Sequence, residues 1–556
     1  MIKIESKKNK FTYNVYHVTK AFYPKEDIVQ TVDEKQEPLV KIHLPEGTCF
    51  SLAPEECVQT EDVQEEKRDV TKKVYQFLSK QTGQKLAWGM LTGVRPTKLV
   101  MQKIEQGMTK EENFEFLKEQ YCVTDKKAQI AYEIACREKA LLDRLDCQNG
   151  YSLYAGIPFC PSICSYCSFS SSPIAEWKDQ VDRYLDAMIK ELKATAKLMQ
   201  GKPLDTVYIG GGTPTTLEAD QLDRLLGTIR ENFDLEHVLE FTVEAGRPDS
   251  ITREKLEVIR KYPVTRISVN PQTMQQKTLD LVGRKHTVED VEQIFHLARE
   301  LGFDNINMDL IAGLPYEDVE SFAHSFDDVY ALKPEQLQLG FLKVLKGSFM
   351  QEHQEEYGIV HKAHPPYEVL YTKWISYEDV LRLKGIEEMV EVYYNSRQFT
   401  NTMEELEKEY DSAFTMYDRL ASYYEDNGYN AVQHKRSARY EILLNYIRLH
   451  HKEKEDLFRE VLTYDYYLRE NAKSRPEFAG EYLVEKDVAR TFYEKEEETH
   501  TYLPDYGKYD RNQMRKMTHL EYFKLADTYI LFDYQNRNPL NQEARVCKVK
   551  AGTGQR

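Results

Sequence analysis

The sequence has no long apolar run and no recognisable export signal. No stretch of 18 or more apolar residues occurs in its 556 residues, so no transmembrane helix is expected. The first residues, Met1–Lys8, lack the apolar core of a signal peptide. With 30% charged residues and a mean hydropathy of −0.63, the composition is that of a globular protein. We therefore expect a cytoplasmic protein of roughly three or four domains.

An excess of basic residues is also missing. The chain has 75 Lys and Arg against 92 Asp and Glu, which gives a formal net charge of −17. General binding to nucleic acid needs a basic surface, so nucleic acid is not an expected partner. The sequence also lacks sustained heptads and repeats of fixed period, which argues against coiled coils and repeat arrays.

Cysteine is scarce and unevenly placed. The nine cysteines are an odd number and make no disulfide framework, which favours a reducing compartment. Three of them, Cys160, Cys164 and Cys167, have C-x-x-x-C-x-x-C spacing, but the nearest others are Cys147 and Cys547. Thiolates select iron-sulfur clusters or zinc, and a closed structural site wants four ligands. The spacing predicts a metal centre whose last ligand is exogenous; the alternative is a structural zinc loop completed by a distant His or Cys.

From residue 151 the pattern alternates between strands and helices. Strands are predicted at Ser152–Pro158, Thr206–Ile209, Leu239–Val243, Thr265–Val269, Asn305–Ile311 and Gln336–Val344. Helices are predicted at 178–200, 218–232, 252–261, 287–301 and 317–331. Such alternation implies parallel βαβ units, and six in succession predict an α/β fold with a partial (βα)6 barrel. The chemistry of such a barrel lies at the carboxyl ends of its strands.

The flanking regions differ from this pattern. Residues 1–150 predict an α+β domain with strands at Lys10–His17 and Leu39–Leu44 and helices at Val70–Thr82 and Glu111–Leu145. A loop from Trp88 to Lys98 enters a helix at Pro96, and its Arg95 and Lys98 form either an anion-binding loop or a solvated turn. The predicted domains are therefore 1–150, 151–345 and 346–556.

Residues 346–556 read as mostly helical and rich in tyrosine. Amphipathic patterns run over 403–428, 436–451 and 455–470, and an apolar run at 529–534 is strand-like. The pairs Tyr423–Tyr424 and Tyr466–Tyr467 either line a pocket or, as we favour, pack against the barrel. His450–His451 is either a metal or heme ligand pair or a surface pair; neighbours on a helix point in different directions, which favours the surface pair.

Polar and glycine-rich segments fall at one rim of the predicted barrel. Gly210–Pro214 follow the second strand, Glu244 ends the third, Asn270–Gln272 end the fourth and Asp309 lies in the fifth. A glycine turn lets the backbone approach a ligand closely, and a carboxylate accepts hydrogen bonds from hydroxyl or ammonium groups. Arg284 is a fixed cation suited to a carboxylate. Singly these residues are ordinary turns, caps and surface charges, but their coincidence at one rim favours a binding site.

These segments carry a family resemblance. The cysteine spacing, with Tyr154 before it and Tyr166 beside Cys167, resembles the radical S-adenosylmethionine (SAM) superfamily. Tyr208–Thr215, Phe241–Pro248, Arg266–Gln272 and Asn307–Pro315 are similar to the oxygen-independent coproporphyrinogen III dehydrogenase family, most of all its HemZ-type branch, over about residues 1–315. The resemblance implies a radical SAM barrel with 4Fe-4S cluster ligands Cys160, Cys164 and Cys167. It implies that S-adenosyl-L-methionine contacts Tyr154, Gly211, Gly212, Thr213, Glu244, Gln272, Arg284 and Asp309.

The resemblance also implies an activity. Enzymes of this family oxidatively decarboxylate propionates to vinyl groups in heme biosynthesis, which implies an oxidoreductase with a porphyrinogen-like substrate. An electron donor such as a flavodoxin or ferredoxin is implied as a partner. Substrate carboxylates need cationic partners, and Arg247, Arg266 and Lys343 are candidates by position.

Two segments depart from this family. The decarboxylating members have a cysteine at the position of Phe169; a phenylalanine resembles the HemZ-type and heme-chaperone branches. The alternatives are therefore a heme-binding chaperone, whose His-Asn-x-x-x-Tyr-Trp motif is absent, and a radical SAM enzyme with another substrate. From about Asp304 onward, the segment Leu337–Ser348 followed by Pro365–Leu370 resembles cobalamin-linked radical SAM proteins, whose tail is a domain of unknown function. Residues 1–150 lack the Asp-x-His-x-x-Gly cobalamin signature.

Overall fold

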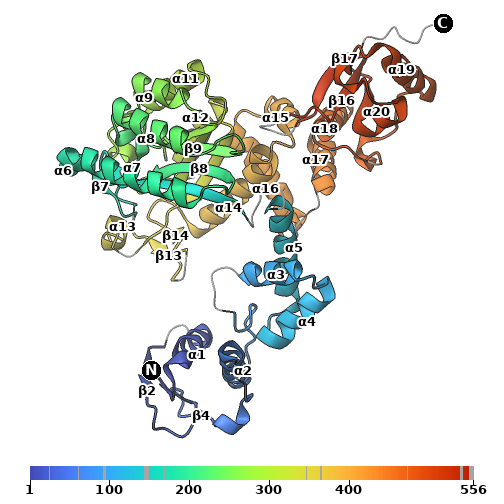
Figure 1. Cartoon of the computed structure of the whole chain (residues 1–556). Coiled ribbons are helices and arrows are strands. Elements are labelled where there is room, and N and C mark those ends of the chain that lie inside the picture. The colour runs from blue at the N-terminus through green and yellow to red at the C-terminus, as the bar shows by residue number, and fades with distance from the viewer. Residues whose placement is uncertain are drawn as a thin grey trace. The chain divides into compact units, whose positions relative to one another are not determined.

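The computed structural model divides the chain into two compact units, Met1–Gly150 and Tyr151–Arg556 (Figure 1). It describes residues 1–23, 26–60, 62–91, 96–142, 149–167, 169–345, 347–363, 366–431, 434, 436–472, 474–538 and 543–549. No helix in these ranges combines the length and the apolar character that crossing a bilayer requires. The division of the second unit at residue 345 stays a prediction.

The first unit is an α+β structure. Its sheet has the order β2 (Ile28–Val32), β1 (Ile2–Ser6), β3 (Val40–His43) and β4 (Cys49–Leu52). Its helices are α1 (Asn9–Phe22), α2 (Val63–Thr82), α3 (Pro96–Glu105), α4 (Lys110–Tyr121) and α5 (Asp125–Leu142). The predicted strand at 39–44 and the helix start at Pro96 are confirmed, while Thr92 to Arg95 lie outside the described residues.

Two predictions for this unit are wrong. The segment Lys10–His17 belongs to helix α1, because the buried residues Phe11, Val15, Val18 and Phe22 recur at helical spacing. The apolar and aromatic residues at every second position suggested a strand, but Tyr13 among them is 64% exposed. The predicted helix 111–145 is two helices, because Cys122 takes a left-handed conformation (φ 58°) that ends α4.

The second unit contains the predicted parallel sheet. Its strands are β5 (Tyr151–Ile157), β8 (Leu204–Gly211), β9 (Glu240–Glu244), β10 (Arg266–Ser268), β11 (Ile306–Ala312) and β12 (Gln336–Phe341). They pair in chain order and all in parallel, and β5 and β12 are the edges of the sheet. The predicted α/β partial barrel is confirmed.

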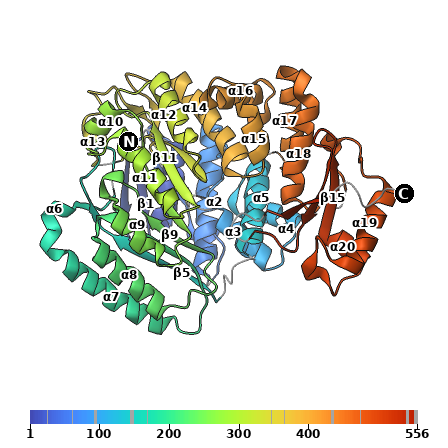
Figure 2. The same ribbon diagram turned by 90° about the horizontal axis from the view of Figure 1, so that it is seen from above.

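Helices connect these strands. They are α7 (Val181–Leu198), α8 (Ala219–Asn232), α9 (Arg253–Arg260), α11 (Val288–Glu300) and α12 (Val319–Ala331), with the short elements β6 (Phe159–Cys160), β7 (Ser172–Pro173), α6 (Ile174–Trp177) and α10 (Gln276–Leu281). Figure 2 shows α7 and α8 side by side along one flank of the sheet. All five predicted helices are confirmed to within a few residues.

Side-chain alternation decides which residues of a strand reach the site. In β11 the residues Ile306, Met308, Leu310 and Ala312 are buried in turn, and the residues between them are only partly buried. Because successive side chains of a strand point to opposite faces, Asp309 lies on the face opposite Met308 and Leu310. The strand pattern therefore directs this carboxylate away from the strand's apolar face.

The C-terminal region continues the same unit. Its helices are α13 (Phe349–Glu352), α14 (Tyr377–Met389), a π-helix η5 (Val390–Asn395), α15 (Thr400–Glu407), α16 (Ala413–Asp426), α17 (Arg436–His450), α18 (Glu455–Arg469), α19 (Lys486–Thr499) and α20 (Arg511–Met517). Its strands are β13 (Val360–His361), β14 (Val369–Tyr371), β15 (Thr518–Phe523), β16 (Thr528–Asp533) and β17 (Arg545–Val549). The mostly helical prediction and the strand near 529–534 are confirmed, and α17 and α18 lie side by side in both views (Figures 1 and 2).

One hydrophobic core joins this region to the barrel. A single cluster of buried side chains runs from Leu153 to Ala479 without a break at residue 345. Tyr417 of α16, for example, packs against Phe326 and Tyr330 of α12 at ring distances of 5.8 Å. The sheet and the helices up to about residue 479 are therefore stabilised by the same contacts.

We expected the tyrosine pairs to pack against the barrel, but their described ring contacts lie within the C-terminal region itself. The Tyr424 and Tyr393 hydroxyls are 2.7 Å apart, and Tyr467 stacks on His519 at 3.6 Å. His450 is exposed, whereas the half-buried His451 has Nε2 3.1 Å from the Tyr410 hydroxyl. Only His450 of the pair is therefore a surface residue, whereas His451 contacts a neighbouring tyrosine.

Candidate active site

The three clustered cysteines lie directly after the first barrel strand. Cys160 and Cys164 are buried, and Cys167 is half-buried with its N–H donating to the Cys164 carbonyl at 2.9 Å. Burial raises the pKa of the Cys167 thiol, and the neighbouring Cys164 and Cys160 raise it further. All three thiols therefore lie in one short segment that follows β5.

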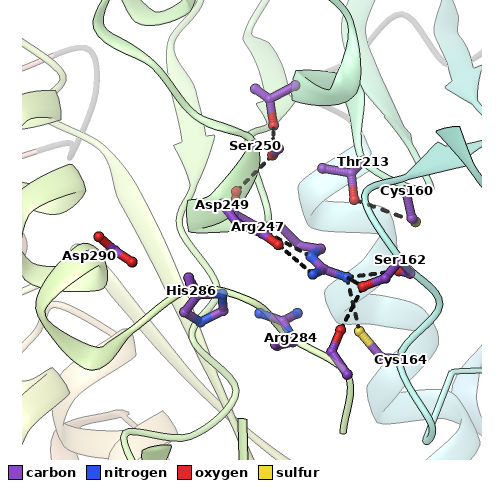
Figure 3. Close-up of polar contacts among 12 residues, drawn as sticks. Cys160, Ser162, Cys164, Thr213, Arg247, Asp249, Ser250, Arg284, His286 and Asp290 are labelled. Carbon is purple, nitrogen blue, oxygen red and sulfur yellow. Dashed lines mark hydrogen bonds and ion pairs between the residues drawn. The ribbon is translucent and has the colours of Figure 1, made fainter. Parts of the chain in front are cut away.

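A buried arginine holds this loop in place (Figure 3). Arg247, which is 3% exposed, donates from Nη1 to the Ser162 carbonyl at 2.8 Å and to the Ser162 hydroxyl at 3.1 Å. The same Nη1 lies 3.5 Å from the Cys164 Sγ, a hydrogen-bond distance for sulfur. Arg247 comes from the loop after β9, so it ties the third strand to the cysteine loop.

Asp249 fixes the orientation of Arg247. Its carboxylate accepts from Arg247 Nε at 3.0 Å and from Nη2 at 2.6 Å, a two-pronged pair that is specific to a guanidinium. Burial acts to raise the pKa of Asp249, but Arg247 outweighs it and the pKa is lowered. The nearby His286 is 1% exposed, and its pKa falls to about 4 through burial and the charge of Arg284. Its imidazole is therefore neutral near pH 7.

The glycine turn after β8 packs directly on the cysteine loop. Gly212 N–H donates to Ile157 O at 2.7 Å, Thr213 N–H donates to Phe159 O at 2.7 Å, and the Thr213 hydroxyl lies 3.5 Å from Cys160 Sγ. A Cβ atom at Gly212 would come within 2.6 Å of Phe159 O and 2.9 Å of Cys160 Sγ. Only glycine permits this approach.

Buried polar contacts also link the turn to the next loop. The Thr215 hydroxyl donates to the Ala245 carbonyl at 3.0 Å and lies 2.6 Å from the Ser250 hydroxyl. Lys255 is 7% exposed, and its ammonium donates to the carbonyls of Thr215 and Ser250 at 2.8 and 3.2 Å. The loops after β8 and β9 therefore form one connected structure.

Two tyrosines and a carboxylate lie on the neighbouring strands β5, β8 and β9. The rings of Tyr154 and Tyr208 stack at 5.9 Å, and the Tyr208 hydroxyl donates to Glu244 Oε1 at 2.5 Å. Tyr154 remains 62% exposed. Burial raises the pKa of Glu244, although the Tyr208 hydroxyl opposes this effect. The exposed ring and the carboxylate are both available to a ligand at the rim.

Arg284 and Gln272 lie deeper, at the ends of β10 and β11. Arg284 is 6% exposed; it donates from Nη1 to the Asn270 carbonyl at 2.5 Å and from Nε to the Tyr166 hydroxyl at 3.2 Å. Gln272 has a left-handed backbone (φ 70°), and its N–H donates to the Asp309 carbonyl at 2.9 Å. A positive φ in a residue other than glycine costs about 1 kcal/mol or more and is common at binding sites.

Asp309 and Gln272 open into a cavity of about 560 Å³. The cavity is lined by Tyr166, Cys167, Phe169, Gln272, Asp309, Leu310, Ile311, Gln338, Leu339, Gly340, Phe341, Leu342, Lys343, Leu345, Glu368 and Glu387. Burial raises the pKa of Asp309 to about 6, with a further contribution from Glu244. The last cysteine, the polar rim and the C-terminal region thus meet around one space.

Glu317 contacts Thr273, the neighbour of the site residue Gln272. The Thr273 hydroxyl donates to Glu317 Oε1 at 2.5 Å, and the other carboxylate oxygen is buried without a partner in the described part of the chain. Burial raises the pKa of Glu317 to about 7. A carboxyl group with a raised folded-state pKa favours the native state at low pH, and this stabilisation is lost as the pH rises from about 4.5 to about 7.

A Glu317→Gln variant is therefore expected to be more stable than the wild type at pH 8, by on the order of 2 kcal/mol. The difference should vanish near pH 4, because the wild-type carboxyl is then protonated in both states. Urea unfolding at both pH values measures this. A constant difference across the pH range would contradict the assignment.

The three cationic candidates for substrate carboxylates have different surroundings. Arg247 is committed to Asp249 and the cysteine loop, and Arg266 lies at the amino end of β10, 3.5 Å from Glu240. The structure therefore contradicts the role considered for these two arginines. Lys343 is exposed and lines the cavity, so it alone of the three stays a candidate.

The donor set fits an iron-sulfur cluster with a polar ligand beside it. No group of three His, Cys, Asp or Glu side chains in the described ranges is arranged to hold a single metal ion. A cluster differs, because each thiolate binds a different iron and the sulfurs need not converge on one point. Ser165 Oγ and Asn270 Oδ1 are buried and lack a partner within the described residues, which fits a site where a ligand completes the hydrogen bonding.

The structure thus gathers the predicted residues in three groups. One group joins the cysteine loop to Thr213, a second joins Tyr154 to Glu244 through Tyr208, and a third joins Arg284 to Gln272 and Asp309. Sequence reasoning missed Asp249, Lys255 and His286. Their signal was weak, because a buried ion pair cannot be told from surface charges in one sequence.

Two family models match parts of this chain. Residues 154–329 match the model of the radical SAM superfamily, and residues 355–543 match the model of a protein family of unknown function, DUF4080. Coproporphyrinogen III oxidase (HemN) from Escherichia coli, a solved structure, is 30% identical and covers 42% of this chain and 51% of that chain with a TM-score of 0.35.

Curated relatives match part of the chain. The oxygen-independent coproporphyrinogen-III oxidase-like protein HemZ of Bacillus subtilis is 40% identical over 287 residues, 51% of this chain and 57% of HemZ. The heme chaperone HemW of Bacillus subtilis is 39% identical over 33% of this chain and 48% of HemW. The oxygen-independent coproporphyrinogen III oxidase of Escherichia coli is 35% identical over 34% of this chain and 41% of that enzyme. The chain therefore spans about half the length of these relatives. Its residues 154–329 match the radical SAM superfamily model, and the chain is similar over part of its length to HemZ and to coproporphyrinogen III oxidase.

Proposed function

We propose that the chain is a radical SAM oxidoreductase of the coproporphyrinogen III dehydrogenase type. Cys160, Cys164 and Cys167 would hold a 4Fe-4S cluster, with S-adenosyl-L-methionine beside it. The observation that carries this proposal is the packing of the glycine turn and Arg247 against the cysteine loop, at the carboxyl ends of the strands. The match of residues 154–329 to the radical SAM superfamily supports it.

The rim residues would bind S-adenosyl-L-methionine by ordinary hydrogen bonding. Glu244 and Asp309 would accept hydrogen bonds from hydroxyl or ammonium groups. Gly211, Gly212 and Thr213 would contact the ligand through the surface of their turn, because the Gly212 and Thr213 amides already donate to Ile157 and Phe159. Arg284 has five donors, and the described contacts leave some of them for a carboxylate. Tyr154 and Gln272 would complete this set at the two ends of the rim.

The substrate we propose is a porphyrinogen that bears propionate side chains. Once bound, the reduced cluster and S-adenosyl-L-methionine supply a 5′-deoxyadenosyl radical able to take hydrogen from such a side chain. The protein's part is to orient the substrate in the cavity and to exclude water with the apolar side chains Ile311, Leu339 and Leu342. The eight described cysteines are unpaired, which fits a reducing compartment such as the cytoplasm. The cluster would need an electron to act, so we propose an electron donor such as a flavodoxin or ferredoxin as a partner.

Phe169 favours a second candidate, a heme-binding chaperone. Its side chain is 74% exposed and lines the cavity where the decarboxylating family members have cysteine. The similarity to HemW supports this alternative. Stoichiometric heme binding without loss of carbon dioxide from coproporphyrinogen III would favour the chaperone over the enzyme.

One experiment tests the proposed function. The full chain is reconstituted anaerobically with iron and sulfide, reduced, and incubated with S-adenosyl-L-methionine and coproporphyrinogen III. We expect 5′-deoxyadenosine, carbon dioxide and a divinyl product. A reconstituted protein that holds no cluster, or that cleaves no S-adenosyl-L-methionine, would overturn the proposal; cleavage without the divinyl product would limit it to another substrate.

A further inference from the structure

Lysines from the C-terminal region gather around one glutamate at the cavity. The ammonium groups of Lys362 and Lys384 both lie 2.8 Å from Oε2 of Glu368, whose side chain is only 13% exposed. Lys384 also lies over the ring of Phe341 at 4.0 Å. Glu368 and Phe341 line the cavity, so the two lysines that contact them lie directly behind its lining.

A third lysine comes from the end of the barrel. Lys343 pairs with Glu368 in an antiparallel bridge, and residues directly opposite each other in such a bridge have side chains on the same face, about 5 Å apart at Cβ. Lys343 lines the cavity and has no ion-pair partner within the described ranges. The bridge therefore places a third ammonium group beside the other two.

We propose that Lys343, Lys362 and Lys384 bind a carboxylate of the substrate at this wall. The proposal rests on the proposed function, since it uses the same cavity. Two of these lysines, Lys362 and Lys384, come from the segment 355–543, which matches a family of unknown function. That segment would therefore contribute to substrate recognition.

Charge and shape both fit a carboxylate on an apolar scaffold. Lys362 and Lys384 pair with Glu368, and Lys384 also lies near Glu387, while Lys343 has no carboxylate partner within the described ranges. Glu368 takes one hydrogen bond from each of Lys362 and Lys384, and each ammonium has three donors, so donors remain for a ligand. The floor beside them is apolar, with Leu339, Leu342 and Leu345.

Binding of a non-reactive probe tests the proposal. Coproporphyrin III carries four carboxylates, and its tetramethyl ester carries the same ring without charge; both are titrated by fluorescence into the full chain. We expect the wild type to bind the acid more tightly than the ester. A Lys343→Gln, Lys384→Gln double variant should bind the acid about tenfold more weakly and the ester unchanged.

A substitution with the opposite sign separates recognition from structure. Glu368→Gln removes the competing carboxylate, so it is expected to tighten binding of the acid; a purely structural role of the ion pairs predicts weaker or unchanged binding. Lys408→Gln, at an exposed lysine paired with Glu405 in the same region, should change neither affinity. The single Lys343→Gln variant keeps the test valid if the double variant is unstable.

Equal binding of acid and ester by the wild type would overturn the proposal. Equal loss of both ligands in the double variant, or weaker or unchanged acid binding in Glu368→Gln, would also overturn it. The outcome is independent of turnover: lysine-dependent binding of the acid together with no cleavage of S-adenosyl-L-methionine supports the carboxylate site and rejects the proposed function.

Discussion

An Arg247→Gln variant is expected to lose most of its iron after reconstitution and about 3 kcal/mol of folding free energy. The substitution removes the donors to Ser162 and Cys164 and leaves the Asp249 carboxylate, 13% exposed, without its partner. Iron and sulfide analysis and urea unfolding of the metal-free protein measure the two effects. Any cluster that forms should have a more negative reduction potential, because a cation beside the cysteine sulfur is gone.

Two matched variants separate the causes. Arg247→Gln combined with Asp249→Asn removes both charges, so it should recover most of the stability but not the iron. Arg247→Lys keeps one charge and loses the two-pronged pair with Asp249, so iron binding should be intermediate. Full iron loading in the double variant would show that Arg247 acts on stability and not on the cysteine loop.

A Gly212→Ala variant is expected to be destabilised by about 2 kcal/mol and to bind the cluster poorly. The added methyl would lie 2.6 Å from Phe159 O and 2.9 Å from Cys160 Sγ, and a backbone carbonyl cannot move aside as a flexible side chain would. The turn must therefore shift away from the cysteine. Urea unfolding and the absorbance of the reconstituted cluster report the two effects.

Gly507 provides the control for this substitution. It has a negative φ of −55° and nothing within 4 Å of the position of a Cβ atom. Gly507→Ala should leave cluster binding unchanged and stability unchanged or slightly raised. A Gly212→Ala protein that loads iron as the wild type does would mean that the turn tolerates a side chain and does not fix Cys160.

The barrel could be predicted from the sequence because its strands are short apolar runs separated by amphipathic helices. Local sequence is enough to predict a buried parallel strand such as β11. It is also enough to predict a helix with a capping box such as α11, where Thr287 and Asp290 close the first turn. The prediction for helix α1 was wrong because it too used only local sequence. Its alternating aromatics imitate a strand, and only the sheet it packs on decides that Val15 is buried and Tyr13 is not.

The candidate site was predictable where a motif is contiguous and not where it is assembled by the fold. Cys160 to Cys167 lie within eight residues, and the glycine turn and Glu244 lie at strand ends. Arg247 was considered as a substrate ligand because nothing in the sequence shows that Asp249 and Ser162 enclose it. The lysine cluster at Glu368 depends on a bridge between residues 343 and 368, which strand propensity does not specify.

The core shared between Leu153 and Ala479 limits how this chain can be divided for experiments. A fragment ending at residue 345 would expose to water the side of Phe326 and Tyr330 that Tyr417 now covers, and such a surface invites aggregation. Grafting the tail onto another barrel would leave the apolar side of Tyr417 without its partners Phe326 and Tyr330. Two halves encoded as separate chains would have to be co-expressed, so that each covers the apolar surface of the other as it folds.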